Sequence, residues 1–215
     1  MQEISLGNVI PSFLDGLDPD TFDSEVWGAS ITFSRGSNYL VKAASGRGKT
    51  TLLRLLTGLR DDYEGDILFD GQSIRGFSPA LWAKYRRDVF SSMFQDLLLF
   101  GELTPVENIR LKPMSRDWSH KDIRDMLGRL GIGDKADVKV SRLSFGQQQR
   151  VAFVRMLCQE ADFLLLDEPV SHLDKKNCLI MAEMLSERVG RDGAGVIVTS
   201  IGRDLPINYE KEVHL

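Results

Sequence analysis

The chain has 215 residues, of which 42% are hydrophobic and 27% are charged, with a net charge of −4 and an isoelectric point of about 5.5. This length predicts a domain that buries a sizeable core without disulfides or metal. The acidic balance argues against a polyanion-binding surface, so we expect no nucleic acid partner. No run approaches the ~20 apolar residues that cross a bilayer, and the N-terminus lacks the features of a signal peptide.

The two cysteines, Cys158 and Cys178, have no metal-ligand spacing. We expect two reduced, buried thiols in a cytoplasmic protein, because reducing compartments rarely keep a disulfide. Any membrane connection would then go through a partner.

The first part of the chain alternates strands with two short helices. Apolar residues recur at every second position in residues 4–9 and 29–33, which predicts half-buried strands. A third strand leads into a glycine-rich turn, and an Asp-Gly turn closes a fourth. The further expected elements are a strand over 38–43, a helix over 50–59, a strand over 65–71 and a helix over 79–87.

The rest of the chain is mostly helical, with apolar strands near its end. Residues 105–160 are predicted to be largely helical, and the run 163–166 suits a buried parallel strand. A parallel sheet wrapped by helices, with a helical insertion, is the expected architecture. The elements expected here are helices over 121–130, 146–157 and 175–189, a strand over 195–199 and a last strand near Val213.

A phosphate-binding loop lies between the third strand and the first helix. Residues 43–50 match the pattern G-x-x-x-x-G-K-[ST] except at the first position, where Ala43 replaces glycine. Gly46 and Gly48 would let backbone N–H groups turn inward around phosphate oxygens, at the positive end of a helix. Lys49 would reach the β- and γ-phosphates, and Thr50 would hold Mg²⁺. The expected ATP-binding set is Ala43, Ala44, Ser45, Gly46, Arg47, Gly48, Lys49, Thr50 and Thr51.

Two carboxylates follow the apolar strand at 163–166. Asp167 and Glu168 stand where parallel sheets bind ligands, at the carboxyl end of a strand. Asp167 is expected in the Mg²⁺ shell, and Glu168 is placed to polarise a water aimed at the γ-phosphate. Standing alone, the pair would rather be interpreted as a solvated strand end, where acidic residues are common.

A third motif, Leu143-Ser-Phe-Gly-Gln-Gln-Gln-Arg150, precedes an apolar helix. Ser144 and the backbone of Gly146 can donate to a phosphate at a helix start. A purely local interpretation is a capping box, with Ser144 as N-cap and Gln147 three residues on. Both interpretations can hold together.

These motifs, in this order, resemble those of ABC transporter ATP-binding subunits, whose signature usually reads LSGGQ followed by Gln-Arg. Residues 94–109 resemble most the branch of lipoprotein-release, macrolide-export and cell-division ATPases. The resemblance implies an α/β P-loop NTPase (RecA-like) fold with a parallel sheet, an N-terminal antiparallel part and a helical signature subdomain. It implies one domain, 1–215, with a core lobe at about 1–94 and 161–215 and a helical subdomain at about 95–160.

The resemblance also implies roles, with ATP and Mg²⁺ as ligands. Gln95 looks like the glutamine that links Mg²⁺ and water to the membrane partner, and residues 171–174 resemble the loop facing the other subunit. Phe13 resembles the aromatic that stacks on adenine, although an ordinary core role is open. The signature, Ser144, Phe145, Gly146 and Gln147, would complete the ATP site of the opposite subunit in a head-to-tail dimer.

One departure concerns hydrolysis. The family follows its last core strand with Thr-His, whereas this chain has Thr199-Ser200. A hydroxyl can hydrogen-bond a phosphate but carries no positive charge. Losing one charge-stabilising contact commonly costs ~10²–10³-fold in rate, so Ser200 predicts slowed hydrolysis.

Four functions are to be compared. The first is a transporter ATPase, a homodimer or heterodimer at the cytoplasmic face of the membrane. Its transmembrane permease partner would contact residues 97–103, although core packing could instead explain some of the leucines there. The second is an ATP-dependent regulatory or structural dimer with little hydrolysis, which Ser200 and Ala43 favour. A DNA-repair or chromosome ATPase would need a long insertion between Lys49 and Ser144, which the chain lacks. A nucleotide kinase would lack the motif at 143–150.

Overall fold

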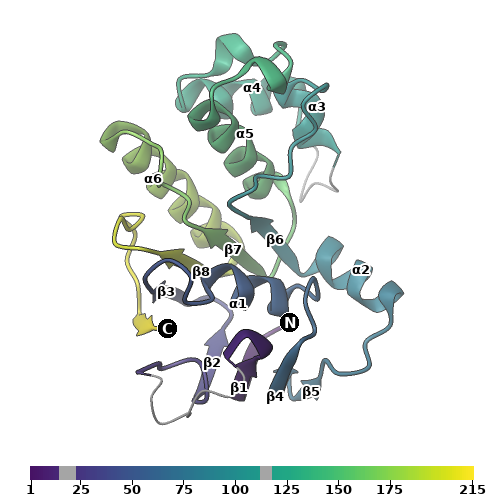
Figure 1. The fold of residues 1–215 in the computed structure, drawn as a ribbon. Coiled ribbons are helices and arrows are strands. Elements are labelled where there is room, and N and C mark those ends of the chain that lie inside the picture. Colours follow the sequence, from purple (N-terminus) through teal and green to yellow (C-terminus); the bar gives the residue numbers. More distant parts are fainter. Residues whose placement is uncertain (15–22, 112–117) are drawn as a thin grey trace.

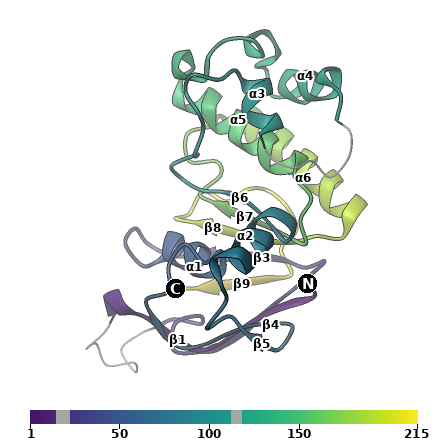
Figure 2. The ribbon, with the colours of Figure 1, turned by 90° about the vertical axis from the view of Figure 1, so that its right-hand side faces the viewer.

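The structure, a computed structural model, describes residues 1–14, 23–111 and 118–215 (Figure 1). An antiparallel sheet lies at one end of the molecule, a parallel sheet lies in the middle, and the helices α3, α4 and α5 lie together at the other end (Figures 1 and 2). The expected α/β fold is thus confirmed.

The antiparallel sheet has the strand order β2-β1-β4-β5. Leu6 of β1 lies opposite Ile31 on one side and Ile67 on the other, which places alternate apolar residues on one face. Asp70 and Gly71 both have positive φ, as the expected Asp-Gly turn requires. The elements are β1 (Glu3–Pro11), the 3₁₀ turn η1 (Ser12–Leu14), β2 (Ser30–Ser34), β4 (Tyr63–Phe69) and β5 (Gln72–Ser73).

The second sheet has the order β6-β7-β8-β3-β9, and all of its pairings are parallel. The pattern did not predict β6, because its sequence Phe-Ser-Ser-Met has no apolar run; the buried Ser91 donates instead to the Met156 carbonyl at 2.8 Å. The two-residue β5 was missed as well. The strands are β3 (Asn38–Lys42), β6 (Phe90–Met93), β7 (Phe163–Asp167), β8 (Gly195–Ser200) and β9 (Lys211–His214).

The helices begin where the sequence offers caps. Ser119 and Ser144 each form a capping box with the third residue of the helix that follows. The first helix ends at Leu56 rather than at residue 59, ahead of the left-handed Gly58, and the last helix runs three residues past its expected end, to a left-handed Gly193. The helices are α1 (Lys49–Leu56), α2 (Pro79–Asp88), α3 (Pro105–Arg110), α4 (His120–Arg129), η3 (Gly133–Lys135), η4 (Val140–Arg142), α5 (Phe145–Cys158) and α6 (Lys175–Asp192).

Two apolar cores lie on the two faces of the parallel sheet. Along β7, Phe163 and Leu165 pack into the core that also contains the leucines of α1 and the inner face of the antiparallel sheet. Leu164 and Leu166 pack on the other side, against the helices α3 to α6. Helix α1 therefore lies between the two sheets, and its N-terminus is fixed at the carboxyl edge of the parallel one.

Both cysteines are free thiols and are buried, as expected. Within the described residues, no helix is long and apolar enough to cross a membrane. Residues 112–117, part of the stretch expected to be helical, lie outside the described residues.

Two glycines that both lack a positive φ provide a test of this packing. A Cβ on Gly195 would lie 2.7 Å from the Phe163 ring and 2.9 Å from the Ser34 carbonyl, whereas one on Gly190 of α6 would meet nothing within 4 Å. We expect Gly195→Ala to lower the free energy of unfolding by about 1–3 kcal/mol through overpacking, and Gly190→Ala to raise it by up to about 1 kcal/mol. Urea denaturation of both variants measures this, and equal effects would contradict the packing described.

Candidate functional site

The loop between β3 and α1 has the backbone shape of an anion cradle. Gly46 and Gly48 have φ of 80° and 95°, a conformation that glycine adopts without steric cost. Gly48 is the N-cap of α1 and supplies no side-chain hydrogen bond, so the first N–H groups of the helix face the loop and can bind an anion. Ala43 is not among the residues with positive φ. The alanine in place of the first glycine of the motif is therefore accommodated without backbone strain.

The Lys49 side chain is turned into this loop and is 5% exposed. Its Nζ donates to the carbonyl oxygens of Ala43 at 3.0 Å and Ala44 at 2.9 Å. It also lies 3.4 Å from Oε1 of Glu168. The ammonium is thus held beside the loop with donors that phosphate oxygens can take over.

Asp167 joins three elements at the carboxyl edge of the parallel sheet. Its carboxylate accepts hydrogen bonds from Thr50 Oγ1 of α1 and Thr199 Oγ1 of β8, both at 2.6 Å. The residue is 2% exposed. A hydroxyl and one carboxylate suit Mg²⁺, which takes few protein ligands and completes its shell with phosphate oxygens and water. The described residues contain no cluster of three His, Cys, Asp or Glu side chains that could hold a metal ion.

Glu168 is the next residue and has a strained backbone. Its φ is 49°, a left-handed conformation that costs a non-glycine residue about 1–2 kcal/mol. Such strain persists where the surroundings impose it, typically at functional sites. The Glu168 N–H donates to the Thr199 carbonyl at 3.1 Å, and the side chain, 12% exposed, faces Lys49. The strain directs this carboxylate into the phosphate loop.

A cavity of about 240 Å³ brings half of the predicted site residues together. The phosphate loop forms one side, and Gln95, which follows β6, contributes another. The complete lining is Phe13, Ser45, Gly46, Gly48, Lys49, Thr50, Thr51, Arg60, Gln95 and Glu168.

Phe13 lies in the turn η1 at the edge of this cavity. It is 42% exposed, so the alternative of an ordinary core aromatic is wrong. A Cβ built on Gly48 would lie 2.8 Å from Phe13 Cζ, which shows how closely the ring approaches the phosphate loop. An exposed aromatic face at this place can stack on a nucleobase.

Ser200 lies at the end of β8, but it is not in this cavity. The residue is 2% exposed, and its Oγ accepts a hydrogen bond from the Gly202 N–H at 3.0 Å. Its neighbour Thr199 points the opposite way, toward Asp167, because successive side chains of a strand alternate. The structure thus does not place the Ser200 hydroxyl with the phosphate loop and Glu168.

The signature lies at the start of α5, away from the cavity that the phosphate loop lines. Ser144 and Gln147 form the expected capping box, with hydrogen bonds of 2.9 Å and 3.4 Å. The exposed Phe145 packs edge to face on His172, with ring centroids 4.8 Å apart. A Cβ on Gly146 would lie 3.3 Å from the His172 carbonyl. The signature therefore contacts the loop at 171–174 of its own chain and not its own phosphate loop.

Two residues of the site were missed in the sequence, because no motif includes them. Trp27 is buried beneath the phosphate loop and donates from Nε1 to the Arg47 carbonyl at 3.1 Å. Arg60 lines the cavity, and its guanidinium donates to Asp62 at 2.7 Å. The hydrogen bonds from Arg60 and then Ser12 hold the pKa of the Asp62 carboxyl well below its usual range. The Ser12 hydroxyl, in the turn that carries Phe13, donates to the same Asp62 carboxylate and so joins this turn to the segment after α1.

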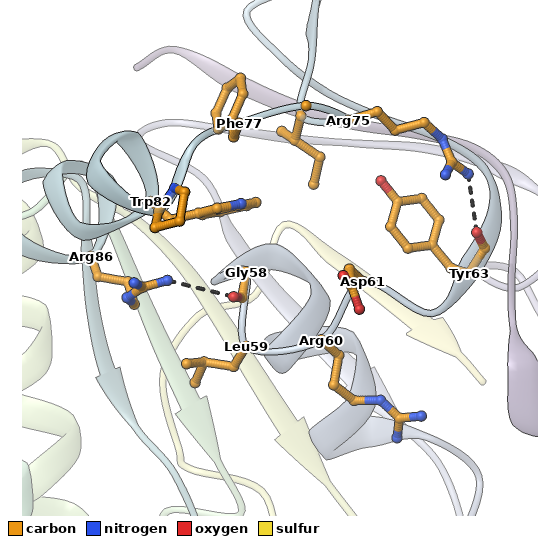
Figure 3. A pocket seen from close by; sticks show the side chains of 12 residues that line it. Gly58, Leu59, Arg60, Asp61, Tyr63, Arg75, Phe77, Trp82 and Arg86 are labelled. Carbon is orange, nitrogen blue, oxygen red and sulfur yellow. Dashed lines mark hydrogen bonds between the residues drawn. The ribbon is translucent and has the colours of Figure 1, made fainter.

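A larger cavity, of about 570 Å³, adjoins the site at Arg60 (Figure 3). Trp82 and Tyr63 lie on its two sides, and Arg86 donates from beneath Trp82 to the carbonyls of Thr57 and Gly58. The indole of Trp82 lies against Gly58, where a Cβ would come within 2.2 Å of the ring. The segment that follows α1 thus separates two neighbouring cavities.

The apolar residues at 97–103 divide between core and surface. Leu97 is 4% exposed and packs in the helical core. Leu98 and Phe100 are 55% and 61% exposed, and they line a groove of about 490 Å³ together with Phe94 and Leu111. Core packing therefore explains Leu97 and, in part, Leu99, whereas Leu98 and Phe100 leave an apolar surface exposed.

Comparison with known proteins identifies the class of this fold and site. The protein family described as ABC transporter matches residues 26–171. The chain is 34% identical over 84% of its length to an ABC transporter ATP-binding protein of Mycobacterium tuberculosis, and 38% identical over 75% to the spermidine/putrescine import ATP-binding protein PotA of Thermotoga maritima. It is 34% identical over 80% of its length to the macrolide export ATP-binding/permease protein MacB of Shewanella oneidensis.

The solved structures agree. A dimeric structure of MJ0796, a bacterial ABC transporter cassette, superposes with a TM-score of 0.76 at 27% identity, covering 98% of this chain and 96% of that one. A post-hydrolysis state of the same cassette, bound to ADP and Pi, gives 0.75 at 26% identity over 92% and 87%. The chain belongs to the ABC transporter family, and the resemblance found in its motifs is confirmed. It spans 56%, 44% and 26% of the lengths of the three sequence relatives.

The loop geometry leads to opposite expectations for two substitutions. Ala43→Gly should change the dissociation constant for Mg-ATP by less than about twofold, because position 43 needs no left-handed backbone. Gly48→Ala should weaken binding by about tenfold or more, since it combines left-handed strain with a Cβ 2.8 Å from Phe13 and 3.1 Å from Trp27 Nε1. Titration with a fluorescent ATP analogue measures both. A tenfold gain from Ala43→Gly would show that the cradle is impaired.

Proposed function

We propose that the chain binds and hydrolyses ATP, dimerises on ATP, and drives a separate transmembrane partner. The observation that carries this proposal is the convergence of Lys49, Thr50, Asp167 and Glu168, which come from two distant segments, around one glycine-turned loop. Each of these residue types has a distinct task in phosphoryl transfer.

In the proposed mechanism, the N–H groups of the phosphate loop and the Lys49 ammonium bind the phosphates of ATP. Thr50 and Asp167, which already contact each other at 2.6 Å, would hold Mg²⁺, which neutralises charge on the phosphates when bound. Glu168 accepts a proton from, or orients, the water that attacks the γ-phosphate. Lys49 lies 3.4 Å from Glu168 in the structure, and bound phosphates would take the lysine from this carboxylate.

Two further residues are proposed to complete the site from the same subunit. Gln95 lines the cavity opposite the phosphate loop, where its amide can orient the water and contribute to the Mg²⁺ shell. Phe13 is exposed at the cavity edge and would stack on adenine. Ser200 would contribute little to the phosphate contacts, since its hydroxyl is bonded to the Gly202 N–H.

A second copy of the subunit is proposed because the signature cannot reach the phosphate loop of its own chain. Ser144, Phe145, Gly146 and Gln147 cap an exposed helix start away from the cavity, and a helix N-terminus attracts phosphate. A head-to-tail dimer would bring this helix start to the ATP of the opposite subunit. The similarity to MJ0796, for which a dimeric structure is described, supports this arrangement.

The membrane partner is proposed to bind the groove beside Gln95. Leu98 and Phe100 expose apolar surface there, which is unusual for a surface that stays in water. One sequence relative is named as an ATP-binding/permease protein, which supports a transmembrane permease as the occupant. The subunit would then reside at the cytoplasmic face of the membrane through that partner.

A specific observation favours a second candidate, an ATP-dependent regulatory or structural dimer with little hydrolysis. Serine replaces the expected histidine at position 200, and its buried hydroxyl does not enter the cavity. A site without that side chain loses one charge-stabilising contact on the γ-phosphate. It can still bind ATP and close.

The first test is the turnover of Mg-ATP by the purified chain at high protein concentration, beside Glu168→Gln. We expect Glu168→Gln to lose at least about 10²-fold in kcat, because general acid–base groups contribute on this scale, and to retain ATP binding. Size-exclusion chromatography with ATP should show a dimer trapped in the variant.

The outcomes separate the candidates. Binding and dimerisation without turnover by either protein would favour the regulatory dimer. Unchanged turnover in Glu168→Gln would show that Glu168 has no catalytic role. Absence of ATP binding would overturn the proposal as a whole.

The proposed partner surface has its own test. Phe100→Asp should move the chain from the membrane fraction to the soluble fraction of the cells that carry its gene, because a charge disfavours burial in an apolar interface. ATP affinity of the purified variant should stay within about twofold, as Phe100 does not line the phosphate cavity. Leu179→Asp is the matched control, since Leu179 is also exposed, at 52%, but lies on α6. Equal loss in both variants would count against the groove.

A further inference from the structure

The loop that follows Gln95 contains two consecutive residues in an unfavourable conformation. Leu97 and Leu98 have φ of 56° and 47°. Left-handed backbone is rare for residues with a Cβ and rarer still in succession. Something outside the loop must therefore hold these two residues.

A single buried side chain from another element provides this restraint. Arg155 of α5 donates from Nη2 to the Leu97 carbonyl and from Nη1 to the Leu98 carbonyl, both at 2.6 Å. The side chain is 7% exposed, and no carboxylate pairs with it in the part of the chain that the structure describes. A planar guanidinium presents its donors in a fixed fork, so it fits the two carbonyls only while both residues stay left-handed.

The restrained turn connects two surfaces of the molecule. On its N-terminal side, Gln95 lines the phosphate cavity. On its C-terminal side, Leu98 and Phe100 line the apolar groove, to which Arg155 itself contributes. Asn108 of α3 anchors the far end of the loop, because its amide bonds both the N–H and the carbonyl of Phe100. The turn at 97–98 is thus the strained part of a loop that is otherwise firmly held.

We propose that Arg155 is a positioning residue that holds the turn at Leu97–Leu98 in its left-handed form, and so keeps Gln95 in the phosphate cavity and Leu98 at the groove at the same time. Without its fork the turn relaxes toward right-handed backbone, and both side chains leave their places. Arg155 does not line the phosphate cavity, and its guanidinium donates to the two loop carbonyls. The inference rests on the proposed function for the roles of cavity and groove, but the strained turn and its restraint do not depend on it.

The competing explanation is that Arg155 only stabilises the fold by satisfying buried carbonyls. The two explanations are distinguished by a second substitution that removes the backbone strain of the turn but does not restore the Arg155 fork. Glycine at position 98 adopts the left-handed backbone conformation without steric strain. Leu98→Gly should therefore compensate for the weakened hydrogen bonds of the Arg155 fork. Phe100→Gly is the matched control, because Phe100 is an exposed apolar residue of the same loop without a positive φ.

The experiment compares four proteins: the unmodified chain, the variant Arg155→Lys, and the double variants Arg155→Lys/Leu98→Gly and Arg155→Lys/Phe100→Gly. Lysine keeps the charge but cannot form the fork. Hydrogen exchange of the 95–100 amides should become about tenfold faster in Arg155→Lys, a loss of about 1.4 kcal/mol in opening free energy. Turnover of Mg-ATP should lose kcat, with KM for Mg-ATP within about twofold, because Lys49 and the loop amides still bind the phosphates.

Recovery of exchange and kcat by Leu98→Gly, and not by Phe100→Gly, is the expected result. No change of exchange in Arg155→Lys, or equal effects of the two glycines, would overturn the inference. If the unmodified chain shows no turnover, the proposed function fails while the exchange measurement still decides this inference. Should Arg155→Lys not fold, Leu98→Gly and Phe100→Gly are compared as single substitutions. Leu98→Gly should then have a higher Tm than Phe100→Gly, and a lower Tm for Leu98→Gly would overturn the inference.

Discussion

The buried Asp167 carboxylate determines how the rest of the site is arranged. It accepts hydrogen bonds from Thr50 and Thr199, and so joins the first turn of α1 to the ends of β7 and β8. A carboxylate that is 2% exposed must have such partners, since an unpaired buried charge is very costly. Because α1 is fixed between two sheets by its leucines, its N-terminus and the phosphate loop are held at this edge. Glu168 then follows in a left-handed conformation that turns it toward Lys49.

The helical part of the chain meets this edge through α5 and the loop after β6. The start of α5 carries the signature and abuts the loop at 171–174, while its middle supplies Arg155 to the strained turn at 97–98. One helix therefore touches both segments that leave the nucleotide edge of the sheet. Helix α5 therefore links the position of the loop after Gln95 to that of the signature.

The two departures from the family pattern have different structural consequences. Ala43 occupies a position with ordinary backbone, so the loop loses nothing when the first glycine is absent. Ser200 lies where the strand ends, and its short side chain bonds the nearby Gly202 N–H. The first departure is conformationally neutral, whereas the second leaves a short hydroxyl that is bonded within its own turn.

Much of this protein follows from its sequence alone. The glycine-turned loop, the Asp-Glu pair after an apolar strand and the serine-capped signature are short patterns whose chemistry is local, and most helix starts follow from their caps. The sequence did not predict β6, because its buried Ser91 is satisfied by a hydrogen bond to the distant Met156 carbonyl. It also did not predict that Trp27 bonds the phosphate loop or that Arg60 lines the cavity. Only the tertiary structure decided that Phe13 and Gln95 share a cavity while Ser200 and the signature stay outside it, and that Arg155 restrains Leu97 and Leu98. Local patterns depend on neighbours in the chain, whereas these contacts join residues far apart in sequence, which only tertiary packing brings together.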